Sequence, residues 1–132
     1  MLEFMLDTNI CIYLMHRRHP DVARRFFENR DKVSISSVVL AELQFGVAKS
    51  NQRETNVRAL KDFTSLLAVL PLTGEAASHY ADIRARLEAD GMPVGPNDLL
   101  IGAHARSLGL TLVTNNRREF DRMPGLKVEN WI

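Results

Sequence analysis

Short apolar runs alternate along this chain with longer segments in which apolar residues recur every three or four positions. The short runs predict strands at residues 2–6, 32–36, 68–72, 110–114 and 126–131. The helical spacing predicts helices that start near Ile10 and then span about 21–29, 38–49, 54–67, 73–91 and 97–109, whereas residues 115–118 are expected to form a loop. This alternation favours an α/β fold in which helices cover both faces of a mostly parallel sheet of about five strands.

Length and composition limit the classes of protein to which the chain can belong. Its 132 residues fit a single domain, residues 1–132, and 45% hydrophobic with 25% charged residues is the balance of a folded globular protein. We expect a cytoplasmic protein without membrane association, because no apolar run approaches the roughly 20 residues that span a bilayer and no signal peptide is evident. The net charge of +1 does not by itself indicate a nucleic-acid binder.

Four acidic residues occupy positions that would bring them to one edge of this sheet. Asp7 directly follows the first strand, and Glu119 follows the strand at 110–114 after the predicted loop. Asp98 stands at a helix start, and Glu42 lies one turn into an apolar helix that leaves the second strand. Helix capping explains Asp7 equally well, the helix dipole explains Asp98, and surface exposure explains the two glutamates. Their convergence at the carboxyl ends of parallel strands nevertheless predicts a shared site.

Carboxylates gathered in one pocket repel one another, and a divalent cation is the natural neutraliser. Oxygen ligands without cysteine or paired histidines suit Mg²⁺, with Mn²⁺ as a substitute, and argue against zinc. His104 is expected at the edge of the core, and the other three histidines are expected at the surface. A magnesium site polarises a phosphate oxygen and lowers the pKa of an attacking water, so the predicted chemistry is phosphodiester hydrolysis.

Four segments of the chain resemble the ordered motifs of the PIN domain, and the resemblance covers the full length. They are Leu6-Asp7-Thr8-Asn9, Ala41-Glu42-Leu43-Gln44-Phe45-Gly46, Pro96-Asn97-Asp98-Leu99-Leu100-Ile101-Gly102-Ala103-His104-Ala105 and Leu112-Val113-Thr114-Asn115-Asn116. The chain is similar in particular to VapC toxins, because the ending from Thr114 to Phe120, followed by Pro124-Gly125-Leu126, resembles the enterobacterial-type members. Four motifs in this order and spacing are far more specific than any one of them.

The resemblance implies a three-layer α/β/α fold, a homodimer and a cognate VapB antitoxin whose tail blocks the site. It gives Asp7 and Asp98 the role of direct metal ligands and places Glu42 near the ion, often through water. Many PIN domains carry an aspartate where this chain has Asn116, and Glu119, three residues later, is the expected substitute. Similar VapC toxins cut initiator tRNA in its anticodon region, and the family leaves a 5′-phosphate and a 3′-hydroxyl.

Further polar and basic residues are expected to serve this site. Asn9, Thr114 or Asn116 would orient water or the carboxylates. Two basic clusters would hold RNA phosphates, although solvated surface positions explain them equally well. These clusters consist of Arg17 and Arg18 after the first helix, and of Arg117 and Arg118 in the predicted loop.

Two other functions remain open at this point. The first is a phosphatase that forms an aspartyl-phosphate on Asp7, although Asn9 stands where such enzymes carry a second aspartate. The second is a PIN-like module that binds RNA or a partner helix without cutting. The intact set of four acidic residues favours an enzyme over the binding module.

Overall fold

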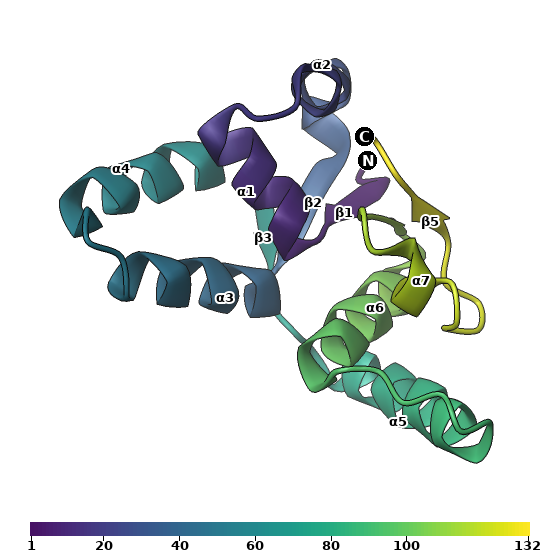
Figure 1. Ribbon diagram of the computed structural model, residues 1–132. Helices are drawn as coiled ribbons and strands as arrows, with labels where there is room; N and C mark the ends of the chain where they lie inside the picture. The colour runs from purple at the N-terminus through teal and green to yellow at the C-terminus, as the bar shows by residue number, and fades with distance from the viewer.

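The computed structural model describes residues 1–132 and contains five β-strands, seven α-helices and one short 3₁₀ helix (Figure 1). The strands are β1 (Phe4–Leu6), β2 (Val33–Ser36), β3 (Ala68–Leu70), β4 (Thr111–Val113) and β5 (Val128–Glu129). The helices are α1 (Thr8–His16), α2 (Pro20–Glu28), α3 (Ser37–Ala48), α4 (Arg53–Thr64), α5 (Gly74–Ala89), α6 (Pro96–Leu108) and α7 (Arg117–Phe120), and the 3₁₀ helix is η1 (Arg30–Lys32).

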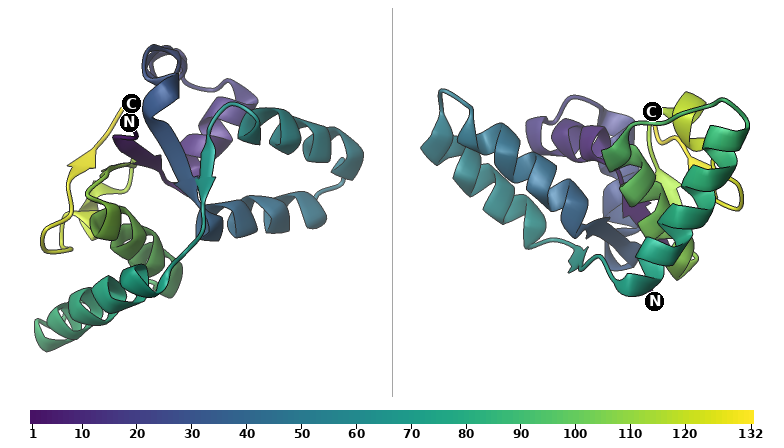
Figure 2. Two further views of the ribbon diagram at one scale, coloured as in Figure 1. Left: turned by 180° about the vertical axis from the view of Figure 1, so that it is seen from behind. Right: turned by 90° about the horizontal axis from the view of Figure 1, so that it is seen from below.

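The five strands form one sheet in the order β3-β2-β1-β4-β5, and every neighbouring pair is parallel. Helices α1 to α4 lie on one side of the sheet, and α5 and α6 lie on the other (Figure 2). The predicted three-layer α/β/α fold with a central sheet of five strands is therefore confirmed. The sheet is entirely parallel, which goes slightly beyond the expectation of a mostly parallel one.

The hydrophobic core explains why β1 and β4 are apolar runs, whereas β2 alternates Val33 and Ile35 with two serines that are buried as well. All four residues of β2 are buried, as are Met5 and Leu6 of β1 and Leu112 and Val113 of β4. Strands that are covered by helices on both faces have no solvent-facing side, and a polar residue there needs a partner inside the protein. The Ser34 hydroxyl donates to the carbonyl of Phe4 at 2.9 Å, and the Ser36 hydroxyl accepts the N–H of Val38. Twenty-five buried hydrophobic residues form one cluster around this sheet. No helix is both long and apolar enough to span a membrane.

The structure moves several of the predicted boundaries; α1, for example, begins at Thr8 and not at Ile10, and β1 is limited to Phe4–Leu6. Residues 117–120 form α7 instead of continuing the predicted loop, because Phe120 is buried and Arg117 makes an ion pair with Asp121 one helical turn away, at 3.2 Å. Helix α6 begins at Pro96, a residue that suits the first helical position because it lacks an N–H group. The last strand, predicted over residues 126–131, covers only Val128 and Glu129.

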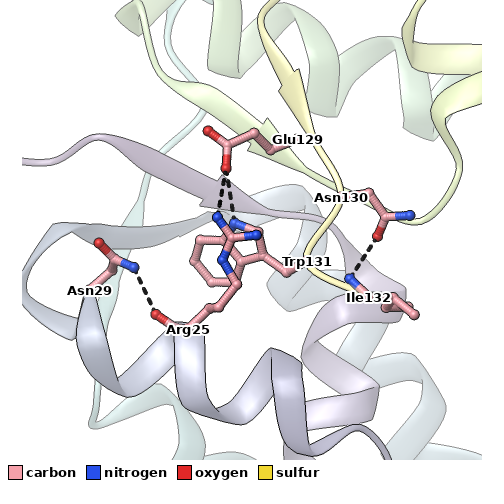
Figure 3. A network of polar contacts seen from close by, with 6 residues as sticks. All are labelled: Arg25, Asn29, Glu129, Asn130, Trp131 and Ile132. Atoms are coloured by element: carbon pink, nitrogen blue, oxygen red, sulfur yellow. Dashed lines mark hydrogen bonds and ion pairs between the residues drawn. The ribbon is translucent and has the colours of Figure 1, made fainter.

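The C-terminal segment is fastened to α2 by a polar and aromatic network (Figure 3). The indole N–H of Trp131 donates a hydrogen bond to Glu129 at 3.2 Å, and the guanidinium of Arg25 pairs with the same carboxylate at 3.5 Å. Arg25 also lies over the Trp131 ring, which is itself buried and packs edge-on against Phe4. This network holds the edge strand β5 against the body of the molecule.

Candidate active site

The four predicted acidic residues lie at the carboxyl edge of the three central strands. Asp7 is the first residue after β1, Glu42 lies in the second turn of α3 after β2, and Glu119 lies in α7 after β4. Asp98 lies in the first turn of α6, whose N-terminus reaches the same edge. Strands β2 and β3 are added on one side of β1, whereas β4 and β5 are added on its other side. The boundary between β1 and β4 is therefore the switch point of the sheet, which is where ligand sites form in open α/β sheets.

Asp7 is buried and uses both of its carboxylate oxygens in hydrogen bonds. Its Oδ1 accepts the backbone N–H of Ile10 at 3.0 Å and so caps α1, while its Oδ2 accepts the hydroxyl of Thr114. Thr114 is fixed in turn by the backbone N–H of Asn116, which donates to its Oγ1 at 2.9 Å. Burial raises the pKa of Asp7, and the hydrogen bond from Thr114 opposes this rise. Asp7 is therefore both a helix cap and one of the four acidic residues at this edge of the sheet.

Glu42 is half-buried and is held from both sides by residues that the sequence analysis did not assign to the site. The hydroxyl of Thr8 donates to Oε1, and the side-chain amide of Asn97 donates to Oε2 at 3.2 Å. Each of these partners directly precedes or follows a predicted acidic residue in the sequence. That adjacency to Asp7 and Asp98 is the signal that could have identified them.

Asp98 and Glu119 lie in contact and interact with the rest of the cluster. Burial raises the pKa of Asp98 to about 7, together with the hydrogen bond to Glu119 and the negative charges of Glu119, Glu42 and Asp7. Glu119, Glu42 and Asp7 are therefore all close enough to influence the titration of Asp98. We call Asp7, Glu42, Asp98 and Glu119 the acidic cluster.

The chemistry of the acidic cluster fits a hard divalent cation. Its donors are oxygen atoms only, and their mutual repulsion is expressed in the raised pKa of Asp98. No group of three acidic, histidine or cysteine side chains is arranged to hold one ion together. A cation at this site would therefore contact fewer carboxylates directly and reach the others through water, as is usual for Mg²⁺.

The remaining predicted site residues lie at different distances from the acidic cluster. Asn9 is exposed, and its backbone N–H interacts with Asp7. Asn116 is half-buried beside Thr114, and the adjacent α7 carries both arginines of the second basic cluster. The first basic cluster, Arg17 and Arg18, is exposed at the far end of α1, about 14 Å along the helix from its start.

The histidines and the cysteine take no part in the acidic cluster. His104 is buried, and its Nδ1 lies 2.8 Å from the hydroxyl of Ser36, so it is a satisfied core residue as expected. His79 was predicted at the surface but is half-buried on α5, with its Nδ1 buried and without a hydrogen-bond partner. Cys11 is buried, and burial raises the pKa of its thiol, which makes it a poor nucleophile.

Comparisons with known proteins identify the family to which the chain is similar. The PIN domain family matches residues 4–126. The chain is 46% identical to "Ribonuclease VapC2" of Haemophilus influenzae over 132 residues, with all of both chains covered. It is 49% identical to "tRNA(fMet)-specific endonuclease VapC" of Shigella flexneri over 131 residues, with 99% of both chains covered.

Solved structures give the same result for the fold. A crystal structure of DNA-bound VapBC from Salmonella typhimurium matches with a TM-score of 0.96 and 45% identity, with all of both chains covered. A structure of VapBC-1 from nontypeable Haemophilus influenzae matches with a TM-score of 0.89 and 36% identity over 98% of both chains. The chain therefore belongs to the PIN-domain family and, within it, to the VapC ribonucleases.

Proposed function

We propose that this protein is a magnesium-dependent endoribonuclease that acts as the toxin of a toxin–antitoxin module. The observation that carries the proposal is the meeting of four carboxyl groups at the switch point of the sheet, where their charges act together on Asp98. The family's nucleases are generally metal-dependent, and Mg²⁺ is the ion that this all-oxygen donor set fits best, with Mn²⁺ as a substitute.

Each acidic residue has a role that follows from its surroundings. Asp7 and Asp98 would hold Mg²⁺ directly, because both belong to the motifs that resemble the PIN ligands. Glu42, which Thr8 and Asn97 orient, would act near the ion through water, and Glu119 completes the pocket beside Asp98. When bound, Mg²⁺ would supply the positive charge that polarises the phosphate and acidifies the attacking water.

The neutral and basic residues would position substrate and ligands. Thr114 fixes the carboxylate of Asp7, and Asn9 and Asn116 lie beside it as candidates for orienting water. Arg118 is exposed on α7, and Arg17 and Arg18 lie far enough along α1 to contact phosphates away from the cut. Arg117 would have to exchange its ion pair with Asp121 for a phosphate.

The substrate and partners follow from the relatives. A relative that is 49% identical is named a tRNA(fMet)-specific endonuclease, so we propose initiator tRNA, cut in its anticodon region, as the substrate. The matching structures are VapBC complexes, so the partner is a VapB-type antitoxin. By the same kinship we propose a homodimer in the cytoplasm.

The test is cleavage of a tRNA pool in Mg²⁺ by the parent chain and by the variants Asp7→Asn and Asp98→Asn. Both variants should lose cleavage and keep the far-UV circular dichroism of the parent, because only a charge is removed. Asp90→Asn changes an exposed residue outside the acidic cluster and serves as the matched control. Full activity of both cluster variants would refute the proposal.

Two further assays on the parent chain separate the alternative functions. RNA that binds to saturation without being nicked in Mg²⁺ or Mn²⁺ would indicate a binding module. A burst of phosphate from small phosphomonoesters would indicate an aspartyl-phosphate enzyme, and we expect none because Asn9 replaces the aspartate that such a mechanism needs.

A further inference from the structure

A cavity of about 160 Å³ opens between α1, α3 and α4 and shares Glu42 with the acidic cluster. Ile12 and Met15 of α1 and Leu43 of α3 give it apolar walls, and His16 and Asn56 add polar groups. We call it the α1–α3 cavity. An RNA strand with its phosphate over the acidic cluster therefore has a partly apolar recess next to that phosphate.

The distance between the cavity and the acidic cluster follows from the positions of the lining residues along α1 and α3. The Thr8–Glu42 hydrogen bond joins α1 to α3 at the edge of the sheet where both helices begin. Ile12 and Gly46 lie four residues further along each helix, which is about 6 Å. This span is comparable to the length of the ribose that separates a phosphate from its base.

Gly46 keeps the cavity open. It lies inside α3, where glycine costs about 0.5–1 kcal/mol relative to alanine. A Cβ atom at this position would meet no atom within 4 Å, and the backbone does not have a positive φ. Neither close packing nor backbone conformation therefore requires glycine here, and its effect is to leave space beside Glu42.

The polar rim of the cavity is suited to the edge of a base. The side-chain amide of Asn56 donates to the hydroxyl of Ser50 at 3.0 Å, which orients the group and leaves its carbonyl oxygen as an acceptor. The ring of His16 adds a second hydrogen-bonding group. Single-stranded RNA is recognised through bases that leave the stack and are held between apolar groups and hydrogen bonds.

We propose that the α1–α3 cavity receives the base of a nucleotide that flanks the cleaved bond, with Asn56 and His16 at the base edge. This inference rests on the proposed ribonuclease function and adds a specificity pocket to it. The pocket contributes affinity for the base that the acidic cluster, which acts on the phosphate, cannot supply.

The variant Gly46→Leu tests the inference because its side chain fills the cavity; since residue 46 lies one helical turn after Glu42, the effect of Mg²⁺ on the temperature of unfolding serves as the check that the acidic cluster stays intact. Gly74→Leu is the matched control, since a Cβ atom at this open position at the start of α5 also meets nothing within 4 Å. We expect kcat/KM for RNA to fall about tenfold in Gly46→Leu, which is the order of the loss of one base contact, and to stay unchanged in Gly74→Leu. The temperature of unfolding and its increase with Mg²⁺ should not fall in either variant.

A modified substrate makes the test specific. Once the cut is mapped, RNAs with an abasic site at one or the other neighbouring nucleotide are prepared. The rates at which the parent and Gly46→Leu cleave them are then compared. One abasic site should slow the parent about tenfold and should have little further effect on Gly46→Leu, because both changes remove the same contact. The variant Asn56→Ala should change the base preferred at that nucleotide.

Four outcomes would overturn the inference. Gly46→Leu could cleave RNA as well as Gly74→Leu does, or the abasic effect could be equal in parent and variant. Normal cleavage by Gly46→Leu with weakened antitoxin binding would assign the cavity to the protein partner instead. A parent chain that cleaves no RNA in Mg²⁺ would reject the proposed function, and the cavity assignment with it.

Discussion

Replacing Asp98 with asparagine removes the acidic group whose pKa is raised furthest within the acidic cluster, while the size of the side chain is kept. Burial and the neighbouring carboxylates raise the pKa of Asp98 from 3.8 to about 7. A folded-state pKa above the unfolded-state value means that the folded protein holds a proton that the unfolded chain releases. Without metal, the contribution of Asp98 to stability is therefore fully present below about pH 4 and is lost as the pH rises to about 7.

The size of the effect follows from the same two values. At about 1.36 kcal/mol per pH unit, the interval from 3.8 to about 7 corresponds to an upper limit of about 4 kcal/mol. Asp98 is only half-buried, and solvent screens such interactions, so we expect about 1–2 kcal/mol. Asparagine resembles the protonated acid at every pH. Asp98→Asn should therefore be more stable than the parent by this amount at pH 8, and by less than half of it at pH 5.

Urea unfolding in EDTA at pH 5 and pH 8 measures this difference, with Asp90→Asn as a control for an exposed aspartate. Added Mg²⁺ should stabilise the parent at pH 8 and have little effect on Asp98→Asn, because a ligand stabilises only the state that binds it. The reasoning is refuted if Asp98→Asn is less stable than the parent at pH 8, or if the difference is the same at both pH values.

Two further predictions concern single contacts. Thr114→Val should lower the free energy of unfolding by about 1–3 kcal/mol, because buried Asp7 loses a donor, and should raise the pKa of Asp7 further. The acid limb of the cleavage pH profile should then move to higher pH, and an unmoved limb would contradict this role. Trp131→Ala should cost about 3–5 kcal/mol in thermal unfolding. Arg25→Ala, which breaks a solvent-exposed pair, should cost less than about 1 kcal/mol, and equal losses would contradict the assignment of stability to the buried ring.

The sequence was sufficient to predict the sheet and the edge at which the acidic residues meet. Strands such as β1 and β4 are short apolar runs because both of their faces are covered, and this pattern does not depend on distant contacts. Asp7 and Asp98 could be placed because the carboxyl ends of parallel strands and the helix starts beside them share one edge. These features are local in sequence, and the alternation of strands and helices then predicts the layers of the fold.

Side-chain partners across the fold could not be predicted in the same way. The Thr8 hydroxyl reaches Glu42 over 34 positions, and Asn97 reaches it over 55. Which of several polar residues near the edge makes such a contact depends on rotamers and on the exact phase of α1, α3 and α6. The α1–α3 cavity is equally non-local, because it needs the space left by Gly46 to face α1 and Asn56 of α4.

The fourth acidic position shows how a local element decides a site. The resemblance to the PIN domain put Asn116 where many members carry an aspartate, and it offered Glu119 as the substitute without a geometry. A loop at 115–118 would leave that side chain free to point in many directions. Helix α7, anchored by buried Phe120, fixes the direction of Glu119 instead and brings it against Asp98. A carboxylate three residues later in the sequence can therefore reach the same acidic cluster, provided that one helical turn forms there.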